Sequence, residues 1–330
     1  AMDELLEALK AIAEPTRFRI LVLCAHGELT VSELVDILGQ SQPRVSRHLR
    51  LMVEAGVLQR QQEGSWAWYR ATGDASSLAA GRRANQSLAT LVEQITDLVP
   101  LDDPIITKDL ERLDRIKETR DQKAAEYFAV NASEWNKIRS LHVDEAEVET
   151  ALLKAFDKHD MGHFLDIGTG TGRILSVLSD KVEAAVGVDT SGQMLAIARS
   201  ALAKTELDKC QVRQADMYNL PFEKAAFNSA CFHMVLHYAS DPEAAIREAS
   251  RVLAPGGRIV IVDFAPHSNE ELRKKHAHLW SGFSNEEITR WCENAGLNVN
   301  APVNFEDGPL TVCLWTADLP ANINSIEEVA

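Results

Sequence analysis

Several features that would indicate a membrane segment, a disulfide framework or a zinc site are missing from this 330-residue sequence. It has no run of eighteen apolar residues, so no membrane-spanning helix is predicted. Its five cysteines are an odd number and contain no C-x-x-C pair, which favours free thiols in a reducing compartment and no bound metal. The amino terminus, AMDELLEALKAIAEPTR, is acidic and lacks a secretory signal pattern. We therefore expect a cytoplasmic protein that does not contact a membrane.

Positive charge is also scarce, because 34 Lys and Arg residues face 49 Asp and Glu residues, which gives a net charge of −15. The deficit is unevenly distributed. Residues 1–100 hold 10 basic and 12 acidic side chains, whereas residues 101–330 hold 24 and 37. The segment 37–53 contains three arginines and no acidic residue. If the protein binds nucleic acid, we expect the first hundred residues to do so.

Proline, glycine and capping residues divide these first hundred residues into short helices followed by two strands. Apolar residues at helical spacing stop before Pro15, and a second such stretch follows it. A third helix is expected between a capping box at Thr30 and the glycine Gly39, and a fourth helix is expected to end at Gly56. The segment VLQRQQEGSWAWYRA then alternates as a hairpin. This order predicts a winged helix-turn-helix domain, mostly helical and of α+β class, over residues 1–99.

The fourth helix of this domain carries polar and basic side chains opposite its apolar stripe. Arg and Gln can hydrogen-bond base edges in the major groove, and Ser and Arg can bind phosphates. A solvated basic face without a partner is the alternative interpretation, and the arginines of the hairpin favour DNA. The residues expected to contact DNA are Ser41, Gln42, Arg44, Ser46, Arg47, His48, Arg50, Arg60 and Arg70.

Residues 3–98 resemble the ArsR/SmtB family of bacterial winged-helix regulators, through the segment EPTRFRIL and the S-Q-P-x-V-S-x-H-L pattern of the fourth helix. The resemblance implies a homodimer, formed by the first helix and a helix at about 74–98, that binds double-stranded operator DNA. The two reading helices of such a dimer lie roughly 34 Å apart. Metal-sensing members carry cysteines where Thr30 and Ser32 stand here, so we do not expect metal sensing by this domain.

The second part of the chain begins with a helical region and continues as alternating strands and helices. The segment LVPLDDPI is a reasonable domain boundary, and residues 100–160 are expected to form a helical linker and lid. The strands HFLDIG, AAVGVD, QVRQAD, FNSACFHMVL and GRIVIVDF then alternate with helices at 173–179, 193–205 and 242–253. Residues 161–330 are thus predicted to form an α/β Rossmann-like domain whose mainly parallel sheet binds its ligand at the carboxyl ends of the strands.

The first strand-to-helix turn of this domain, Asp166 to Gly172, contains glycines spaced G-x-G-x-G. Dinucleotide sites normally use G-x-G-x-x-G around a pyrophosphate. Bare backbone beside a carboxylate instead suits the methionine tail and sulfonium of S-adenosyl-L-methionine (SAM). Asp189 ends the second strand, where it can accept the ribose hydroxyls, and Asp216 ends the third, where it can hold the adenine amine. The pattern favours SAM, or its product S-adenosyl-L-homocysteine (SAH), as the ligand.

Residues 120–318 resemble the class I SAM-dependent methyltransferases, in the branch that methylates small molecules. The resemblance is carried by LDIGTGTG, VGVDTS, ADMYNLPFEKAAF and RVLAPGGRIVI. It implies that Asp166, Gly168 and Gly170 form the methionyl pocket, that Asp189 binds ribose and that Asp216 binds adenine. The residues expected to contact the cofactor are Tyr127, Asp166, Gly168, Gly170, Gly172, Asp189, Thr190, Met194, Asp216, Met217 and His233.

His233 and His237 lie at and just beyond the end of the fourth strand, and they are the candidate catalytic residues. Either could act as a general base on an oxygen or nitrogen nucleophile. The alternative is that His237 only packs or caps locally. His267 is interpreted as an exposed surface residue.

These features support two main hypotheses about function. The protein is either a transcription regulator that responds to SAM or SAH, or an active small-molecule methyltransferase whose winged helix serves mainly for dimerisation. The two are compatible. Arsenite methylation is a minor alternative, since only Cys210 and Cys231 lie plausibly near the site. DNA methylation is disfavoured because no N/D-P-P-Y segment follows the fourth strand.

Overall fold

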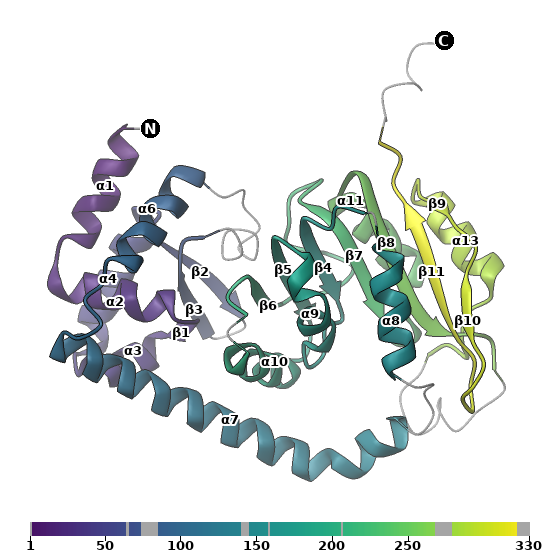
Figure 1. The fold of residues 1–330 in the computed structure, drawn as a ribbon, viewed down its shortest axis with the longest axis horizontal. Coiled ribbons are helices and arrows are strands. Elements are labelled where there is room, and N and C mark those ends of the chain that lie inside the picture. The colour runs from purple at the N-terminus through teal and green to yellow at the C-terminus, as the bar shows by residue number, and fades with distance from the viewer. Residues whose placement is uncertain are drawn as a thin grey trace.

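The computed structural model describes residues 2–63, 66–73, 85–139, 145–157, 159–205, 207–267 and 279–321. An amino-terminal unit and a larger carboxyl-terminal unit lie side by side, and the long helix α7 (Pro104–Arg139) runs beneath both (Figure 1). Within these ranges, none of the helices has the length and apolar character needed to cross a lipid bilayer.

The amino-terminal unit is a winged helix-turn-helix, as predicted. Thr30 forms the expected capping box with Glu33, and Gly39 ends the same helix with a φ of 64°. Leu34 and Leu49 are fully buried and join the turn-linked helices to one core. The three strands are antiparallel in the order β1-β3-β2. The elements are α1 (Met2–Ile12), α2 (Pro15–Ala25), β1 (Leu29–Thr30), α3 (Val31–Leu38), α4 (Gln42–Glu54), β2 (Leu58–Glu63), β3 (Trp66–Ala71) and α6 (Gln86–Asp97).

Helix α7 is attached to the amino-terminal unit by a buried ion pair. Arg19 of α2 donates both of its terminal hydrogen bonds to the carboxylate of Asp109, at 2.6 and 2.7 Å. Further along, α7 contacts α10 of the carboxyl-terminal unit. The region expected to form a helical linker contains two helices, because α7 ends at Arg139 and α8 (Glu145–Ala155) follows as a separate helix.

The carboxyl-terminal unit is built on a sheet in the order β10-β11-β8-β7-β4-β5-β6, with β9 paired to β11. The five strands predicted from the sequence are present and mutually parallel, and the strands after them are antiparallel. The strands are β4 (His163–Ile167), β5 (Ala184–Asp189), β6 (Cys210–Gln214), β7 (Phe227–His233), β8 (Leu253–Phe264), β9 (Asn298–Val299), β10 (Val303–Phe305) and β11 (Val312–Asp318).

Helices cover both faces of this sheet, so neighbouring strand residues enter different cores. Leu165 belongs to one buried cluster, whereas Phe164, the preceding residue of β4, belongs to the other. The chain leaves β4 towards β5 and β6 and then crosses to β7 on the other side of β4. In open α/β sheets ligands bind where the strand order reverses, so a ligand site is expected at the carboxyl end of β4. The helices are α9 (Arg173–Leu178), α10 (Gly192–Lys204), α11 (Pro242–Val252) and α13 (Asn285–Asn294), with short turns η1 (Ser179–Lys181) and η2 (Leu236–Tyr238).

Candidate functional site

The glycine turn after β4 combines left-handed backbone with a close approach by a neighbouring segment. Gly168, Gly170 and Gly172 have φ values of 76°, 53° and 78°, which glycine adopts without steric cost. A Cβ on Gly168 would lie 2.3 Å from Cγ2 of Val235, so only glycine lets the segment after β7 pack there. A Cβ on Gly170 would meet no atom within 4 Å. Bare backbone and open space therefore meet at Gly170.

Asp166 lies buried beside this turn and keeps one oxygen without a partner. Its Oδ2 accepts a hydrogen bond from the Thr169 hydroxyl at 2.6 Å, whereas its Oδ1 has no hydrogen-bond donor among the residues that the structure describes. Burial, and secondarily the negative charge of Asp189, raises the pKa of Asp166 to about 7. A buried acceptor without a donor is costly, and a cationic ligand group would satisfy it. The residues present therefore fit the ammonium group of a methionyl tail.

Asp189 ends β5, and Asp216 follows the end of β6 by two residues, so both lie at the carboxyl ends of the two strands next along the sheet. The Asp189 carboxylate accepts hydrogen bonds from the backbone N–H groups of Gly170, at 3.0 Å, and Ser191, at 2.8 Å. The exposed Asp216 carboxylate accepts one from the N–H of Tyr218 at 3.0 Å. Gln214 links the two loops, because its side-chain amide donates to the Thr190 carbonyl at 2.8 Å. Sequence analysis did not identify Gln214, whose only signal was its place two residues before Asp216 in a predicted strand.

The other predicted cofactor contacts lie around the same sheet edge or next to it. Thr190 is exposed in the loop after β5, and Met194 and Met217 are half-buried. His233 is half-buried at the end of β7. Gly172 faces α10, because a Cβ there would lie 3.1 Å from that of Ala198. Tyr127 belongs to α7, and its side chain lies outside the described residues. The cofactor roles of all these residues stay predictions.

His237 forms a buried pair with Asp263, a residue that sequence analysis missed. The His237 side chain is 2% exposed, and its Nδ1 lies 2.8 Å from Oδ1 of Asp263. The Asp263 carboxylate also accepts the backbone N–H groups of His237, at 3.2 Å, and Phe264, at 2.8 Å. Because Nδ1 is held by the carboxylate, the ring has a fixed orientation with Nε2 directed away from Asp263. The only sequence signal for Asp263 was an acid near the end of an otherwise apolar strand.

His267 lies close to this pair, so its predicted exposure is wrong. The residue is half-buried, and its ring packs edge-on to that of Phe264 with centroids 5.7 Å apart. Burial, followed by the nearby His237, lowers the pKa of His267. Phe264 also stacks near His237. The two histidines therefore flank one aromatic ring at the end of β8.

The predicted DNA-contacting residues in and next to α4 are placed on its surface with one exception, and in the hairpin the side chain of Arg70 is only 16% exposed. The exception is His48, whose side chain is only 13% exposed and lies 3.9 Å from Glu14, so its expected outward orientation is wrong. Burial is the main cause that lowers its pKa. Arg70 of the hairpin is engaged with Asp208 of the other unit. The exposed members of the set are Ser41, Gln42, Arg44, Ser46, Arg47, Arg50 and Arg60.

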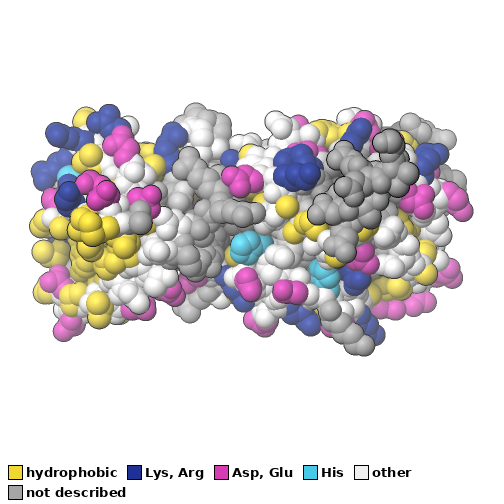
Figure 2. All heavy atoms as spheres, turned by 90° about the horizontal axis from the view of Figure 1, so that it is seen from above, with side chains coloured by type: hydrophobic (Ala, Val, Ile, Leu, Met, Phe, Trp, Pro, Cys, Tyr) yellow, Lys and Arg dark blue, Asp and Glu magenta, His cyan; other side chains and the backbone are white. Residues whose placement is uncertain are grey.

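The amino-terminal unit also exposes apolar side chains on its outer helices. Leu6 and Leu9 of α1 are each 44% exposed, and Leu51 of α4 is 39% exposed. Figure 2 shows hydrophobic side chains gathered at the end of the molecule that carries these amino-terminal elements, beside a group of Lys and Arg side chains.

The cysteines considered for arsenic chemistry lie on different strands. Cys231 is on β7 and Cys210 on β6, and β4 and β5 separate them in the sheet. Three strand spacings correspond to roughly 14 Å. Burial raises the pKa of Cys210 to about 11 and that of Cys231 well above its usual value. Neither the spacing nor the protonation of these thiols supports a shared site for a thiophilic ion.

Two segments of the chain match known families. Residues 165–261 match the family described as "Methyltransferase domain", and residues 14–60 match "Bacterial regulatory protein, arsR family". Both resemblances stated from the sequence are thereby confirmed. The matched segments contain the glycine turn with its carboxylates and the helix-turn-helix, respectively.

Individual relatives match one part of the chain or the other. A demethylmenaquinone methyltransferase of Thermus thermophilus is 41% identical over 106 residues, which are 31% of this chain and 47% of the relative. The arsenic resistance transcriptional regulator ArsR1 of Pseudomonas putida is 47% identical over 62 residues, 18% of this chain and 48% of the relative. The chain thus spans about half the length of each. The crystal structure of the YcgJ protein of Bacillus subtilis superposes with a TM-score of 0.49 at 18% identity, covering 54% of this chain and all of that one.

Proposed function

We propose that this chain, in which an ArsR-type DNA-binding domain is joined to a methyltransferase domain, is a DNA-binding regulator that binds SAM or SAH and responds to it. The observation that carries the proposal is the buried Asp166 carboxylate, with an oxygen that no donor satisfies among the described residues, next to the open backbone of Gly170. Asp189 and Asp216 extend the same edge with two further acceptors.

In this proposal each carboxylate binds a different part of SAM or SAH. Asp166 accepts the ammonium group of the methionyl tail, which lies against the bare backbone of the glycine turn, Asp189 accepts the ribose hydroxyls, and Asp216 accepts the adenine amine. Bound SAM supplies a methyl group on a cationic sulfur, and SAH lacks both that methyl group and that charge. A pocket containing a buried carboxylate distinguishes the two by electrostatics, since opposite charges interact strongly where water is excluded.

The same site supports methyl transfer to a small molecule as a second function. The observation that favours it is the His237–Asp263 pair at the carboxyl end of β7 and β8. Asp263 orients the imidazole, and Nε2 of His237 is the atom that takes a proton from the acceptor. A relative of the methyltransferase part bears the name demethylmenaquinone methyltransferase, which supports a small-molecule acceptor. The acceptor is best sought by incubating the protein and SAM with a metabolite extract and following repeated formation of SAH.

DNA binding is proposed for a homodimer. The apolar residues Leu6 and Leu9 of α1 offer a surface that a second copy of the chain would cover. Pairing two copies through outer helices presents two α4 helices to one face of a duplex, roughly 34 Å apart, on a near-palindromic site. The exposed arginines of α4 then bind bases and phosphates.

Calorimetric titration with SAH and with SAM tests the proposal directly. Wild-type protein is expected to bind, and Asp189→Ala is expected to lose the binding because the ribose hydroxyls lose their acceptor. Asp157→Ala is the matched control, since that carboxylate is exposed and pairs with Lys181 on the surface. No heat with either ligand, or unchanged affinity in Asp189→Ala, would contradict the assignment of the site.

The regulatory part of the proposal needs a separate measurement. DNA duplexes enriched by the wild-type protein from a random library serve as the probe, and their affinity is measured with and without saturating SAH. The affinity is expected to change. If the protein binds SAH at the assigned site and its DNA affinity stays the same, the protein is a methyltransferase and not a SAM- or SAH-responsive regulator.

A further inference from the structure

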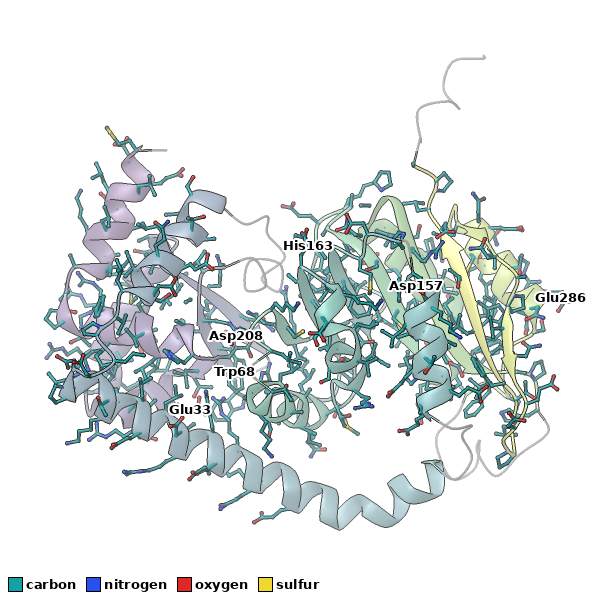
Figure 3. The ribbon with its side chains drawn as sticks, viewed as in Figure 1. Glu33, Trp68, Asp157, His163, Asp208 and Glu286 are labelled. Atoms are coloured by element: carbon teal, nitrogen blue, oxygen red, sulfur yellow. The ribbon has the colours of Figure 1, made fainter. Side chains whose placement is uncertain are left out.

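The hairpin of the winged helix packs against the methyltransferase domain through a tryptophan held between two arginines. The guanidinium of Arg199, from α10, lies 4.2 Å from the centre of a Trp68 ring, and that of Arg120, from α7, lies 5.2 Å from it. Figure 3 shows Trp68, Glu33 and Asp208 where the two units meet. Cations over an indole attract its π-face, and the attraction is greater where water is excluded.

Each of these arginines also pairs with a glutamate of the amino-terminal unit. Arg199 lies 2.9 Å from Glu28, and their side chains are only 8% and 10% exposed. Arg120 lies 2.7 Å from Glu33 and donates to the Glu28 carbonyl at 3.0 Å. Buried charges are tolerated only with well-placed partners, so an ion pair buried between two domains specifies one relative arrangement.

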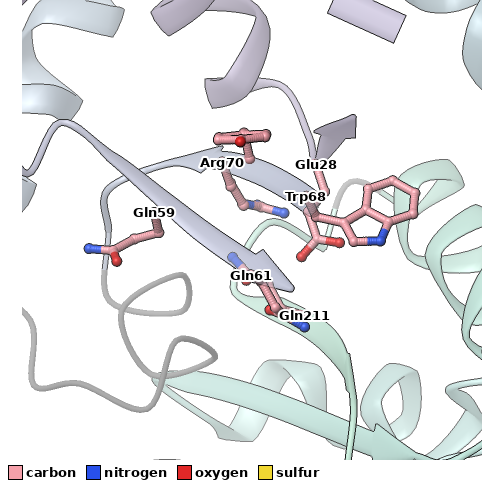
Figure 4. A pocket seen from close by; sticks show the side chains of 7 residues that line it. Glu28, Gln59, Gln61, Trp68, Arg70 and Gln211 are labelled. Carbon is pink, nitrogen blue, oxygen red and sulfur yellow. The ribbon is translucent and has the colours of Figure 1, made fainter. Parts of the chain in front are cut away.

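The hairpin covers the edge strand of the methyltransferase sheet. Gln61 of β2 donates to the Val212 carbonyl of β6 at 3.4 Å, and Arg70 of β3 donates to the Asp208 carbonyl at 2.8 Å. Figure 4 shows β2 running over β6, with the side chain of Gln61 beside Gln211. A cavity of about 10 Å³ lies between them, the space of a single water molecule. This junction is therefore a packed contact and not a ligand pocket.

The elements that receive the hairpin also carry the carboxylates of the proposed SAM site. Helix α10, which bears Arg199, begins directly after the loop of Asp189, whose carboxylate binds the N–H of its capping residue Ser191. Strand β6 leads directly into Asp216. The two loops are joined by the hydrogen bond from the Ala215 N–H to the Asp189 carbonyl, at 3.1 Å. A ligand bound at these loops would therefore be coupled to the hairpin through α10 and β6, which contact both.

Docking of the hairpin also opposes DNA binding. The side chain of Arg70, a predicted DNA contact, is turned to Asp208, with 3.6 Å between its guanidinium and the carboxylate. The part of the chain after residue 100 has 13 more acidic than basic residues, and it lies against the hairpin. DNA phosphates approaching the hairpin would compete with Asp208 for Arg70 and would be repelled by the acidic domain.

We propose that Glu28, Trp68, Arg70, Arg199 and Asp208, together called the wing latch, form an autoinhibitory contact through which a ligand in the SAM site weakens DNA binding. This inference rests on the function proposed above. The bound ligand orders the loops of Asp189 and Asp216 and so favours the docked hairpin, whereas DNA favours its release. By linkage, DNA weakens ligand binding by the same factor by which the ligand weakens DNA binding.

The latch is tested with the double variant Glu28→Gln/Arg199→Met, which removes the two opposite charges of this buried pair together. Neither residue belongs to the proposed SAM site or to the exposed face of α4. For the wild type, saturating SAH is expected to reduce the affinity for library-selected duplexes about 5-fold or more. For the double variant the reduction is expected to be less than about 2-fold, while its calorimetric affinity for SAH is expected to fall only by the factor by which SAH weakens DNA binding to the wild type, and not to be lost. The matched control is Arg258→Ala, which breaks the Arg258–Asp318 pair within the methyltransferase domain and is expected to keep the full response.

Hydrogen exchange provides a readout that does not require DNA. SAH is expected to slow exchange of backbone amides in 58–63 and 66–71 of the wild type, but only around 189–216 in the double variant. An equal DNA response in wild type and double variant would overturn the latch and leave the proposed regulation standing, as would a response in which SAH strengthens DNA binding. SAH binding without any effect on DNA in the wild type would overturn both, through the failure of the proposed function.

Discussion

Two buried aspartates near the carboxyl ends of strands in the same sheet have opposite surroundings. Asp166 of β4 and Asp263 of β8 lie on either side of β7, and both carboxylates are almost inaccessible to solvent. Both oxygens of the Asp263 carboxylate are hydrogen-bonded within the protein, to the backbone and ring of His237 and to the backbone of Phe264. Asp166 has one bond to Thr169 and an oxygen without a donor among the described residues. This difference in hydrogen bonding indicates that Asp263 orients the His237 side chain, whereas Asp166 has an oxygen available to a ligand.

The largest expected effect comes from removing Asp263. Asp263→Ala leaves two buried backbone N–H groups and the His237 ring without an acceptor, which is expected to lower the free energy of unfolding by about 3–5 kcal/mol. Urea denaturation followed by circular dichroism measures this free energy of unfolding. The exposed Asp157→Ala should change stability by less than about 0.5 kcal/mol. A loss for Asp263→Ala as small as that of the control would show that these hydrogen bonds do not stabilise the fold.

A milder substitution separates stability from the proposed catalytic role. Asp263→Asn keeps the shape and one acceptor, but its amide no longer offers two acceptor oxygens to His237. If His237 is the general base, methyl transfer to an acceptor found by the metabolite screen should fall about 10²–10⁴-fold. SAH affinity should be unchanged, since Asp263 does not touch the proposed cofactor site. A rate and a pH profile equal to those of wild type would leave the pair with a purely structural role.

Asp166→Asn should act in the opposite direction on stability. Burial raises the pKa of Asp166 from 3.8 to about 7, so between these pH values the folded protein binds a proton that the unfolded chain has lost. Stability therefore falls as the pH rises from about 4 through 7, and the penalty of the buried charge persists above pH 7. Asparagine is neutral at every pH, so the Asp166→Asn variant does not bury a charge and does not lose this stability. We expect Asp166→Asn to raise the unfolding temperature at pH 8 and to have little effect at pH 4; a lower unfolding temperature at pH 8 would contradict the raised pKa.

The same carboxylate predicts how ligand binding depends on pH. The ammonium of SAH binds the ionised form of Asp166, so the affinity of the wild type should weaken as the pH falls below about 7, approaching 10-fold per pH unit. Calorimetry between pH 5 and 8 measures this dependence. Asp166→Asn should bind about 10–100-fold more weakly at pH 8 and show a flat profile. Asp263→Asn is the matched comparison and should keep the wild-type slope. A wild-type profile without a slope would mean that Asp166 does not contact the ligand.

Features encoded locally could be predicted from the sequence, and those set by packing between distant segments could not. The capping box at Thr30 and the acids ending β4, β5 and β6 were predicted because each depends on a few neighbouring residues. The pairing of Asp263 with His237 requires two adjacent strands to be aligned, and Glu28–Arg199 requires two domains to dock. No spacing within the sequence indicates either contact.

The inward orientation of His48 could have been predicted from the sequence. Val45, Leu49 and Met52 form the buried stripe of α4, and position 48 lies three residues after the first and four before the last. Residues at these spacings share one side of a helix. The side chain accordingly lies inward beside Glu14 rather than on the DNA face. The strands β9 to β11 were missed for different reasons: β9 and β10 have only two and three residues, and the seven residues of β11 are almost all buried and so show no alternating pattern.

The smallest expected effects come from the two glycines beside Asp166, and they test whether space there is reserved for a ligand. Gly168→Ala would place a methyl group 2.3 Å from Val235, so it should destabilise the fold and lower SAH affinity together. In Gly170→Ala the added Cβ meets no atom within 4 Å. The free energy of unfolding should therefore fall only by the cost of a left-handed backbone at alanine, about 1 kcal/mol. If the open space at Gly170 belongs to the ligand, that modest loss of stability should accompany a clear loss of SAH affinity. Gly39→Ala, also left-handed and facing open space but in the other domain, should lose similar stability and no affinity. Equal SAH affinities for the Gly170 and Gly39 variants would mean that the ligand does not occupy this space, and that the oxygen of Asp166 left without a donor serves something else.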